Sequence, residues 1–92
     1  MTQRAQIERP RLVGHARYRW DKVRKQHQVV FPEGMLVLNE TGSQIVQRLD
    51  GAKTRQELTA ELVEQFADCR ASDVSEFIRR LEQRGLLCDG AS

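Results

Sequence analysis

The chain has 92 residues, of which 39% are hydrophobic and 30% charged, and its net charge is +2. This length supports one domain with a single core. The longest uninterrupted aliphatic or aromatic runs are residues 29–31 and 35–38, too short to span a bilayer, and we expect no membrane partner. The first residues lack the apolar core of a secretion signal, so we expect a cytoplasmic protein.

The charges are distributed unevenly along the chain. Residues 1–27 carry eight Arg or Lys and two acids, whereas residues 28–92 carry seven Arg or Lys and eleven acids. A cationic first third can be a solvated tail plus the exposed face of a strand, or it can attract an acidic partner. The sequence leaves both interpretations open.

Residues 1–15 contain Pro10 and Gly14 and little apolar periodicity, which predicts a flexible arm or a loosely docked lead-in. From Arg17 the pattern has a period of two, with Tyr18 and Trp20 on one face, as in a strand. Residues 27–31 form a second predicted strand, and residues 32–34 (Pro-Glu-Gly) form a turn before a third strand at residues 35–38. Short links favour an antiparallel meander, with the first or third strand at an edge.

Three helices are predicted after the strands. The first runs from a cap at Asn39 or Thr41 to about Leu49 and is stopped by residues 50–51 (Asp-Gly). The second covers about residues 54–67, because Thr54 and Glu57 have the spacing of a capping box.

The third predicted helix covers residues 72–84, with Ser72 as its cap. Its apolar positions Val74, Phe77, Ile78 and Leu81 have helical spacing, which is typical of a core stripe. Residues 86–88 then form a short extended tail. The predicted fold is α+β, with a three-stranded antiparallel sheet followed by three α-helices over a single domain of residues 16–90.

No group of residues predicts catalysis, a metal site or a cofactor, so we expect a protein that is not an enzyme. His15 and His27 have no carboxylate or cysteine at ligand spacing, and Cys69 and Cys88 form no CxxC pair. Phosphate-binding and nucleophile-elbow motifs are absent from the sequence. Glu57, Glu61 and Glu64 are interpreted as a solvated helix face.

A winged helix-turn-helix nucleic-acid-binding protein is the alternative, since two helices joined by a short turn follow a small sheet. In such proteins the start of the second helix of the motif faces DNA. Here that segment carries Asp73, Ser75 and Glu76, and the two acids would repel phosphates. We therefore expect no nucleic-acid partner.

The third strand has four apolar residues, no charge and no proline. Natural sheets usually avoid such an edge, because its unpaired backbone groups template another strand. Either the helices bury residues 35–38 on both faces, or the strand accepts a peptide by strand addition.

Several short motifs in this order resemble the PqqD family, the small peptide chaperones of pyrroloquinoline quinone (PQQ) biosynthesis. The resemblance covers about residues 10–89, although Leu49 and Gly42 stand where many members have Cys and Ala. The motifs are Asp21-Lys22-Val23-Arg24, Pro32-Glu33-Gly34, Leu38-Asn39, Asp50-Gly51 before Thr54, Asp73-Val74 with Phe77-Ile78, and Gly85-Leu86-Leu87.

The resemblance implies a winged helix-turn-helix-like fold that acts on peptides as a RiPP recognition element, with no catalytic residue. Members bind the ribosomal precursor peptide PqqA and present it to PqqE, a radical S-adenosylmethionine (SAM) enzyme. Related domains bind leader peptides as an added strand on the third strand, beside the third helix.

Transferred to this chain, the resemblance predicts a peptide along the third strand and one flank of the third helix. Arg80 and Arg84 would face acidic residues of the peptide. The same edge leaves open a monomer or a strand-exchanged homodimer. The predicted peptide-binding residues are Met35, Leu36, Val37, Leu38, Asn39, Asp73, Phe77, Arg80 and Arg84.

Overall fold

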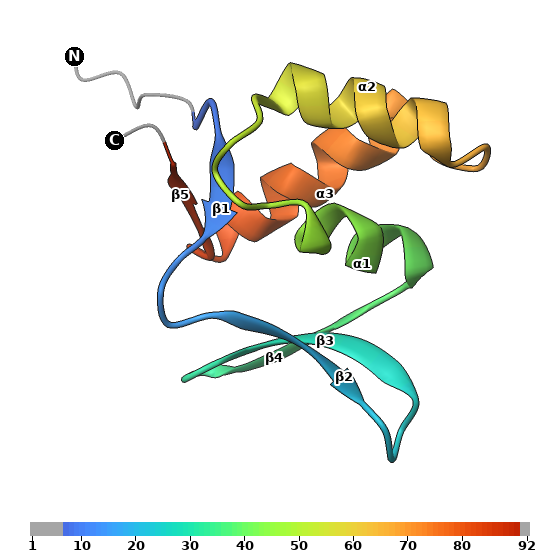
Figure 1. The fold of residues 1–92 in the computed structure, drawn as a ribbon. Helices are drawn as coiled ribbons and strands as arrows, with labels where there is room; N and C mark the ends of the chain where they lie inside the picture. The colour runs from blue at the N-terminus through green and yellow to red at the C-terminus, as the bar shows by residue number, and fades with distance from the viewer. Residues whose placement is uncertain (1–6, 91–92) are drawn as a thin grey trace.

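The computed structural model describes residues 7–90, in which three helices lie on one side of a three-stranded sheet, with α1 nearest to it (Figure 1). The sheet contains β2 (Arg17–Asp21), β3 (Gln26–Phe31) and β4 (Gly34–Leu38), all antiparallel, in the order β2-β3-β4. The predicted fold class is confirmed, and the third strand lies at one edge of the sheet.

The period of two along the strands decides which face meets the helices. Val29 is fully buried and pairs with Leu36 of β4, while Leu38 is 5% exposed, so this face forms part of the core. Met35 and Val37 alternate with these leucines and are 46% and 52% exposed. The sheet is therefore covered on one face only.

The first two helices begin at the predicted caps. The helix α1 (Glu40–Gln47) follows Asn39, whose side chain accepts a hydrogen bond from the Gly42 NH at 2.7 Å. The helix α2 (Arg55–Gln65) follows Thr54, and Thr54 and Glu57 each accept a hydrogen bond from the backbone NH of the other. The capping box is confirmed, and Asn39 rather than Thr41 caps the first helix.

The helix α3 (Ala71–Gln83) begins one residue before the predicted cap, so the assignment of Ser72 as its cap is wrong. Arg70 occupies the cap position, and the carboxylate of Asp73 accepts a hydrogen bond from its backbone NH at 3.2 Å. An acid in the first turn therefore supplies the end contact that we expected from a serine hydroxyl.

The core lies between the sheet and the helices and contains residues from every helix. Val74, Ile78 and Leu81 of α3 are fully buried, as the predicted stripe requires, while Phe77 is half-buried at its margin. None of the helices formed by residues 7–90 is long and apolar enough to cross a bilayer.

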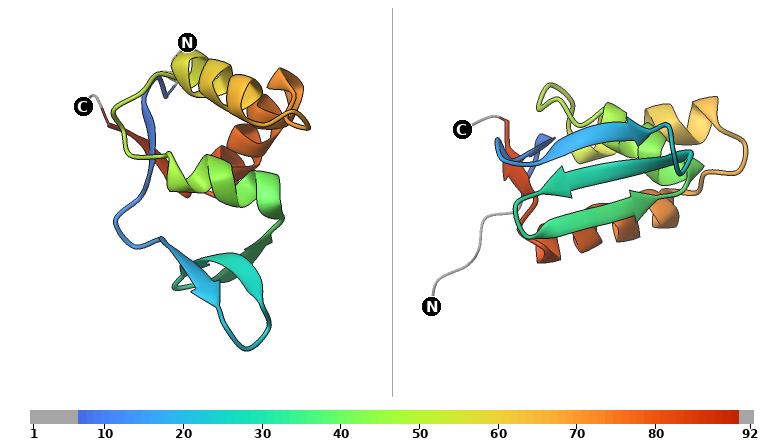
Figure 2. Two further views of the ribbon diagram at one scale, coloured as in Figure 1. Left: turned by 45° about the vertical axis from the view of Figure 1, so that its right-hand side comes forward. Right: turned by 90° about the horizontal axis from the view of Figure 1, so that it is seen from below.

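A second, two-stranded sheet joins the two ends of the described chain. The strand β1 (Pro10–Leu12) pairs antiparallel with β5 (Leu87–Asp89), and Gly51 NH donates to the Pro10 carbonyl at 3.2 Å (Figure 2). Residues 10–12 therefore form a paired strand, so of the two alternatives for residues 1–15 the flexible arm is wrong for these three residues, whereas residues 1–6 lie outside the described part. The extended C-terminal tail is confirmed.

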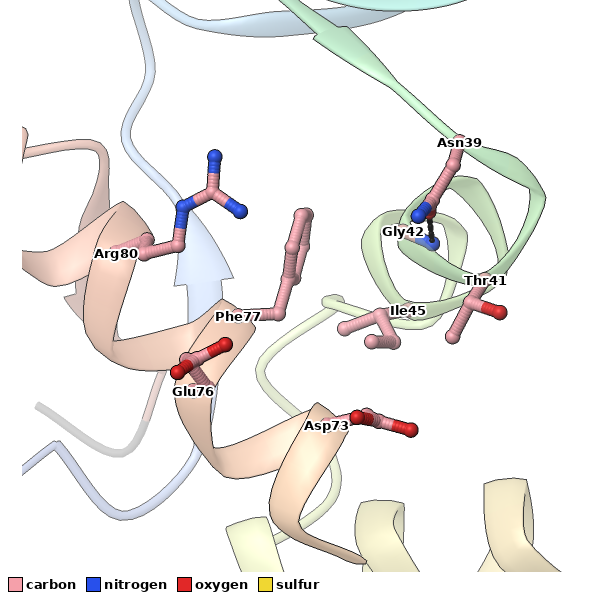
Figure 3. Close-up of a pocket in the computed structure, with 8 residues that line it drawn as sticks. All are labelled: Asn39, Thr41, Gly42, Ile45, Asp73, Glu76, Phe77 and Arg80. Carbon is pink, nitrogen blue, oxygen red and sulfur yellow. Dashed lines mark hydrogen bonds between the residues drawn. The ribbon is translucent and has the colours of Figure 1, made fainter. Parts of the chain in front are cut away.

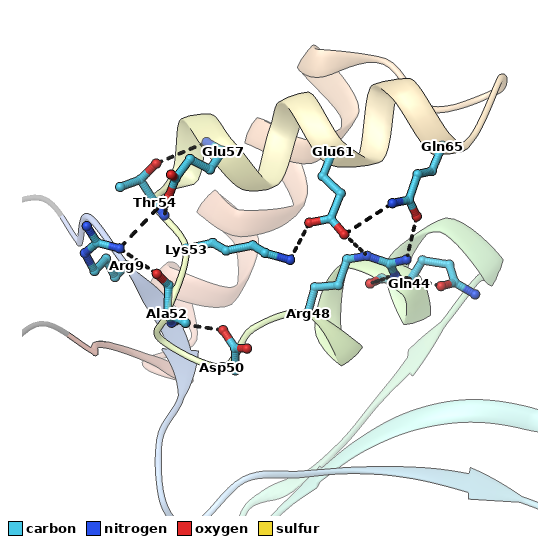
Figure 4. A network of polar contacts seen from close by, with 10 residues as sticks. All are labelled: Arg9, Gln44, Arg48, Asp50, Ala52, Lys53, Thr54, Glu57, Glu61 and Gln65. Atoms are coloured by element: carbon cyan, nitrogen blue, oxygen red, sulfur yellow. Dashed lines mark hydrogen bonds and ion pairs between the residues drawn. The ribbon is translucent and has the colours of Figure 1, made fainter.

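A polar network holds the end of α1 to α2 (Figure 4). Glu61 of α2 accepts from Lys53 at 2.5 Å and from Arg48 at 3.4 Å, and Arg48 also donates to Gln65 at 3.0 Å. The Arg48 guanidinium lies 5.3 Å from the centre of the Phe66 ring. Glu61 is therefore a half-buried, paired residue rather than part of a solvated face.

The contact between Gly51 and Gly90 predicts a position that tolerates no side chain. A Cβ atom at Gly90 would lie 2.4 Å from the Gly51 Cα, a backbone atom that moves only with its loop. We expect Gly90→Ala to lower the free energy of unfolding by about 1–3 kcal/mol, the range for overpacking. Gly14→Ala, where a Cβ meets no atom within 4 Å, is the matched control, and equal urea midpoints for the two variants would contradict the contact.

The network at Glu61 predicts a loss of stability in acid. The hydrogen bond from Lys53 holds the pKa of Glu61 below its ordinary value of 4.5. Because the folded pKa is lower than the unfolded one, the stabilisation is complete above about pH 4.5 and is lost as the pH falls through the folded pKa. The free energy of unfolding, measured with urea between pH 3 and 7, should fall less in acid for Glu61→Gln than for Glu64→Gln, the exposed-site control. Parallel pH curves for the two variants would contradict a stabilising role of the ionised Glu61.

Candidate functional site

The outer edge of β4 is open over the described residues. Within residues 7–90, β4 pairs with β3 alone, and α3 runs beside and beyond this edge when the molecule is seen from below (Figure 2). Met35 and Val37 are exposed on the outer face of the sheet. The alternative in which the helices bury residues 35–38 on both faces is therefore wrong.

The register of the β3–β4 hairpin determines which backbone groups of this edge are available. Phe31 pairs with Gly34 across a two-residue turn, and the closing pair of such a turn exchanges hydrogen bonds. Alternation along the ladder then directs the NH and CO groups of Leu36 and Leu38 toward β3. Those of Met35 and Val37 point away from β3, to the open edge.

A hollow of about 240 Å³ lies where β4 leads into α1, with α3 as its other wall (Figure 3). The polar groups come from both sides, and the Phe77 ring stands between Asn39 and Arg80. The lining residues are Asn39, Thr41, Gly42, Ile45, Asp73, Glu76, Phe77 and Arg80.

Four of the predicted site residues meet in this hollow, although two of them also have structural roles. Asn39 caps α1 and Asp73 accepts the Arg70 NH, so each offers only part of its hydrogen-bonding capacity to a ligand. Phe77 and Arg80 contribute a half-buried ring and an exposed guanidinium. This wall thus combines an apolar surface with both signs of charge.

The other predicted residues do not line the hollow. Met35 and Val37 belong to the open edge, and the side chains of Leu36 and Leu38 turn toward the helices. Arg84 follows the last residue of α3, and its NH bonds the Arg80 carbonyl at 3.3 Å. It is exposed but is not brought into the hollow with Arg80.

Sequence reasoning missed four lining residues, Thr41, Gly42, Ile45 and Glu76, of which Gly42 and Glu76 influence the shape and charge of the hollow. Glu76 lies three residues after Asp73 and four before Arg80, so helical spacing was a usable signal for it. Gly42 gave no such signal, because its contribution is the absence of a side chain: a Cβ there would lie 3.0 Å from the Phe77 ring. The glycine allows α1 and the ring to approach closely.

The described residues of the site provide hydrogen-bonding groups and an apolar contact surface rather than an evident reactive group. Among the described residues, no cluster of three or more His, Cys, Asp or Glu side chains could hold a metal ion. Cys69 is buried and burial raises its pKa, which keeps the thiol protonated and unreactive. The arrangement is suited to holding an extended chain.

A comparison with models of known protein families identifies the family that has this architecture. The family model described as coenzyme PQQ synthesis protein D (PqqD) matches residues 26–87, which include β3, β4 and all three helices. The chain belongs to the PqqD family. The predicted resemblance is confirmed.

Known relatives agree with this assignment. The PqqA binding protein of Acinetobacter baylyi is 30% identical over 74 residues, covering 78% of this chain and 75% of that protein. The PqqA binding protein of Kluyvera intermedia is 35% identical over 75 residues, covering 78% and 82%.

A solved PqqD structure has the same fold. The solution structure of the PqqD part of Methylobacterium extorquens PqqCD, described as a functional, stand-alone RiPP recognition element, aligns with a TM-score of 0.64. The alignment covers 86% of this chain and 87% of the other at 24% identity.

The register predicts an alternating pattern of amide hydrogen exchange along β4. The amides of Leu36 and Leu38 donate to β3 and should exchange slowly, whereas those of Met35 and Val37 face solvent and should exchange much faster. NMR exchange measured on the free protein checks this pattern. Protection of Met35 and Val37 with rapid exchange at Leu36 would show that the register is different.

Proposed function

We propose that this chain is a peptide chaperone of PQQ biosynthesis, which binds the precursor peptide PqqA by strand addition to β4 and presents it to the radical SAM enzyme PqqE. The observation that carries the proposal is the open edge of β4, with outward backbone groups at Met35 and Val37. Two relatives that are called PqqA binding proteins support the choice of peptide.

Strand addition would use the backbone groups that the fold leaves unpaired. A peptide beside β4 can exchange hydrogen bonds with the NH and CO groups of Met35 and Val37, which extends the sheet to four strands. Backbone bonds of this kind give affinity without demanding a particular peptide sequence, and nearby side-chain pockets add specificity.

The hollow beside α3 is the proposed source of that specificity. Phe77 offers an apolar contact, Asp73 and Glu76 offer negative charge, and Arg80 offers positive charge. We propose that the peptide places its side chains along this wall, with an acidic side chain near Arg80. Arg84 would contribute only if the peptide extends past the hollow along α3.

The same observations favour a peptide over the nucleic-acid alternative. Asp73 and Glu76 are exposed in the first half of α3, where a winged helix-turn-helix protein would approach phosphates. Repulsion between these carboxylates and the phosphate backbone disfavours that docking.

The open edge also bears on the oligomeric state. A second copy of the chain can pair with β4 through the same backbone groups that would receive the peptide. We therefore propose that self-association by strand exchange competes with peptide binding for this edge. The peptide-loaded form is then a monomer. It acts in the cytoplasm.

Replacement of Val37 by proline tests strand addition directly. Its NH faces the open edge, so proline removes a bond to the peptide without removing one to β3. We expect Val37→Pro to weaken binding of synthetic PqqA at least about tenfold, since an amide donor is lost and the ring obstructs the added strand.

Val37→Ala, which keeps the amide, is the matched control and should bind nearly as the native chain does. Isothermal titration calorimetry measures the affinities, and an amide NMR spectrum verifies that both variants are folded. Equal affinity of folded Val37→Pro and the native chain would show that the peptide binds elsewhere.

A further inference from the structure

The turn that joins β2 to β3 projects from the molecule on the side away from the helices (Figure 1 and Figure 2, left). Its four residues, Lys22, Val23, Arg24 and Lys25, are all exposed. Val23 is 89% exposed, more than any other large apolar residue in the described part of the chain. The turn thus displays one apolar side chain among three cations.

This display is held in place by a buried acid. Asp21 is 4% exposed, and its Oδ1 accepts hydrogen bonds from the NH groups of Val23 and Arg24 at 3.0 and 3.2 Å. Its Oδ2 accepts from Gln28 at 3.1 Å and pairs with Arg24 at 3.3 Å. The turn is therefore a preorganised structure rather than a loose connection.

The backbone conformation of the turn also indicates that the turn is preorganised. Lys25 has a φ of +54°, and it is the one residue other than glycine with a positive φ in residues 7–90. Such a conformation is uncommon for a lysine and persists only where its surroundings impose it. Asp21 binds the NH groups of Val23 and Arg24, so its hydrogen bonds fix the chain up to the residue before Lys25.

Positive charge extends from the turn along β2. Arg17 and Arg19 are exposed and alternate with Tyr18 and Trp20. Asp21 is the only acid between residues 17 and 31, and Arg24 pairs with it. We call this group of exposed residues the basic hairpin surface. Its members are Arg17, Arg19, Lys22, Val23, Arg24 and Lys25.

The basic hairpin surface is separate from the proposed peptide site. The strand order β2-β3-β4 places it at the opposite edge of the sheet from β4, so an added peptide strand would leave it uncovered. Half-exposed Trp20 belongs to the same edge strand, although it alternates with Arg17 and Arg19 and so lies on the other face of the sheet, with its ring 4.8 Å from that of His27. Tryptophan and arginine are the residues most enriched where protein interfaces derive their affinity.

We propose that the basic hairpin surface is a second docking site, which binds an acidic patch on the enzyme that receives the peptide. This inference rests on the proposed function, because presentation requires one surface for the peptide and another for the enzyme. Charge complementarity steers the two proteins together, and Val23 provides a contact that is buried when they meet.

A local acidic patch on a protein fits this surface better than a nucleic acid or a bilayer. The cations are confined to one hairpin, and exposed acids such as Glu33, in the turn after β3, and Glu40, at the start of α1, follow on the adjoining segments. A continuous array of phosphates would meet those acids as well, whereas a protein patch of hairpin size would not.

The test compares the double variant Lys22→Glu, Val23→Asp with the control Arg79→Glu. The double variant keeps the backbone NH groups that bind Asp21, so the turn is expected to fold. Arg79 is an exposed cation of α3 that does not line the hollow. Purified PqqE and synthetic PqqA are the probes, and biolayer interferometry at 50 and 300 mM salt measures binding.

We expect the double variant to bind PqqE at least about tenfold more weakly at low salt, with unchanged affinity for PqqA. Arg79→Glu should match the native chain, and Val37→Pro should show the reverse pattern, losing PqqA and keeping PqqE. Equal binding of PqqE by the double variant and the native chain would overturn the proposal. A second outcome would also overturn the proposal: the native chain binds duplex DNA or anionic vesicles, and the double variant loses that binding while it still binds PqqE.

Discussion

The hydrogen-bond register between β3 and β4 is the constraint on which the site depends. The two-residue turn fixes Phe31 opposite Gly34, and this pairing directs Leu38 into the core and Val37 outward. In an antiparallel ladder the same alternation also decides which backbone groups are used internally. Met35 and Val37 therefore expose both their side chains and their amides, and a slip of one residue would bury them and expose Leu38 instead.

The end of β4 couples this edge to the helical layer. Asn39 is the last residue before α1, and its side chain both caps that helix and lines the hollow. Gly42 then brings α1 close to the Phe77 ring of α3. The position of the hollow relative to the strand edge is thus set by a helix cap and a missing side chain, which explains why the two features meet at one point of the fold.

The sequence predicted those parts of the structure that depend on local patterns. Period-two strands, the Thr54 cap and the apolar stripe of α3 are properties of neighbouring residues, and each is present. The pairing of β1 with β5 joins residues nearly eighty positions apart, and three-residue strands carry too little pattern to predict it. In the site, Glu76 could have been found by spacing, whereas the limited reach of Arg84 required coordinates.

Within the described residues, the cations Arg9, Arg17 and Arg19 of the first third have different surroundings. Arg9 donates to the Ala52 carbonyl at 2.5 Å and lies near Glu57, so it helps to fasten β1 to the start of α2. Arg17 and Arg19 lie on β2, at the opposite edge of the sheet from β4, beside a turn in which Asp21 binds the NH groups of Val23 and Arg24. The charge asymmetry is therefore partly structural and partly available to a partner. The available part lies at β2 and its turn, at the opposite edge of the sheet from β4, so a strand added to β4 would leave it uncovered.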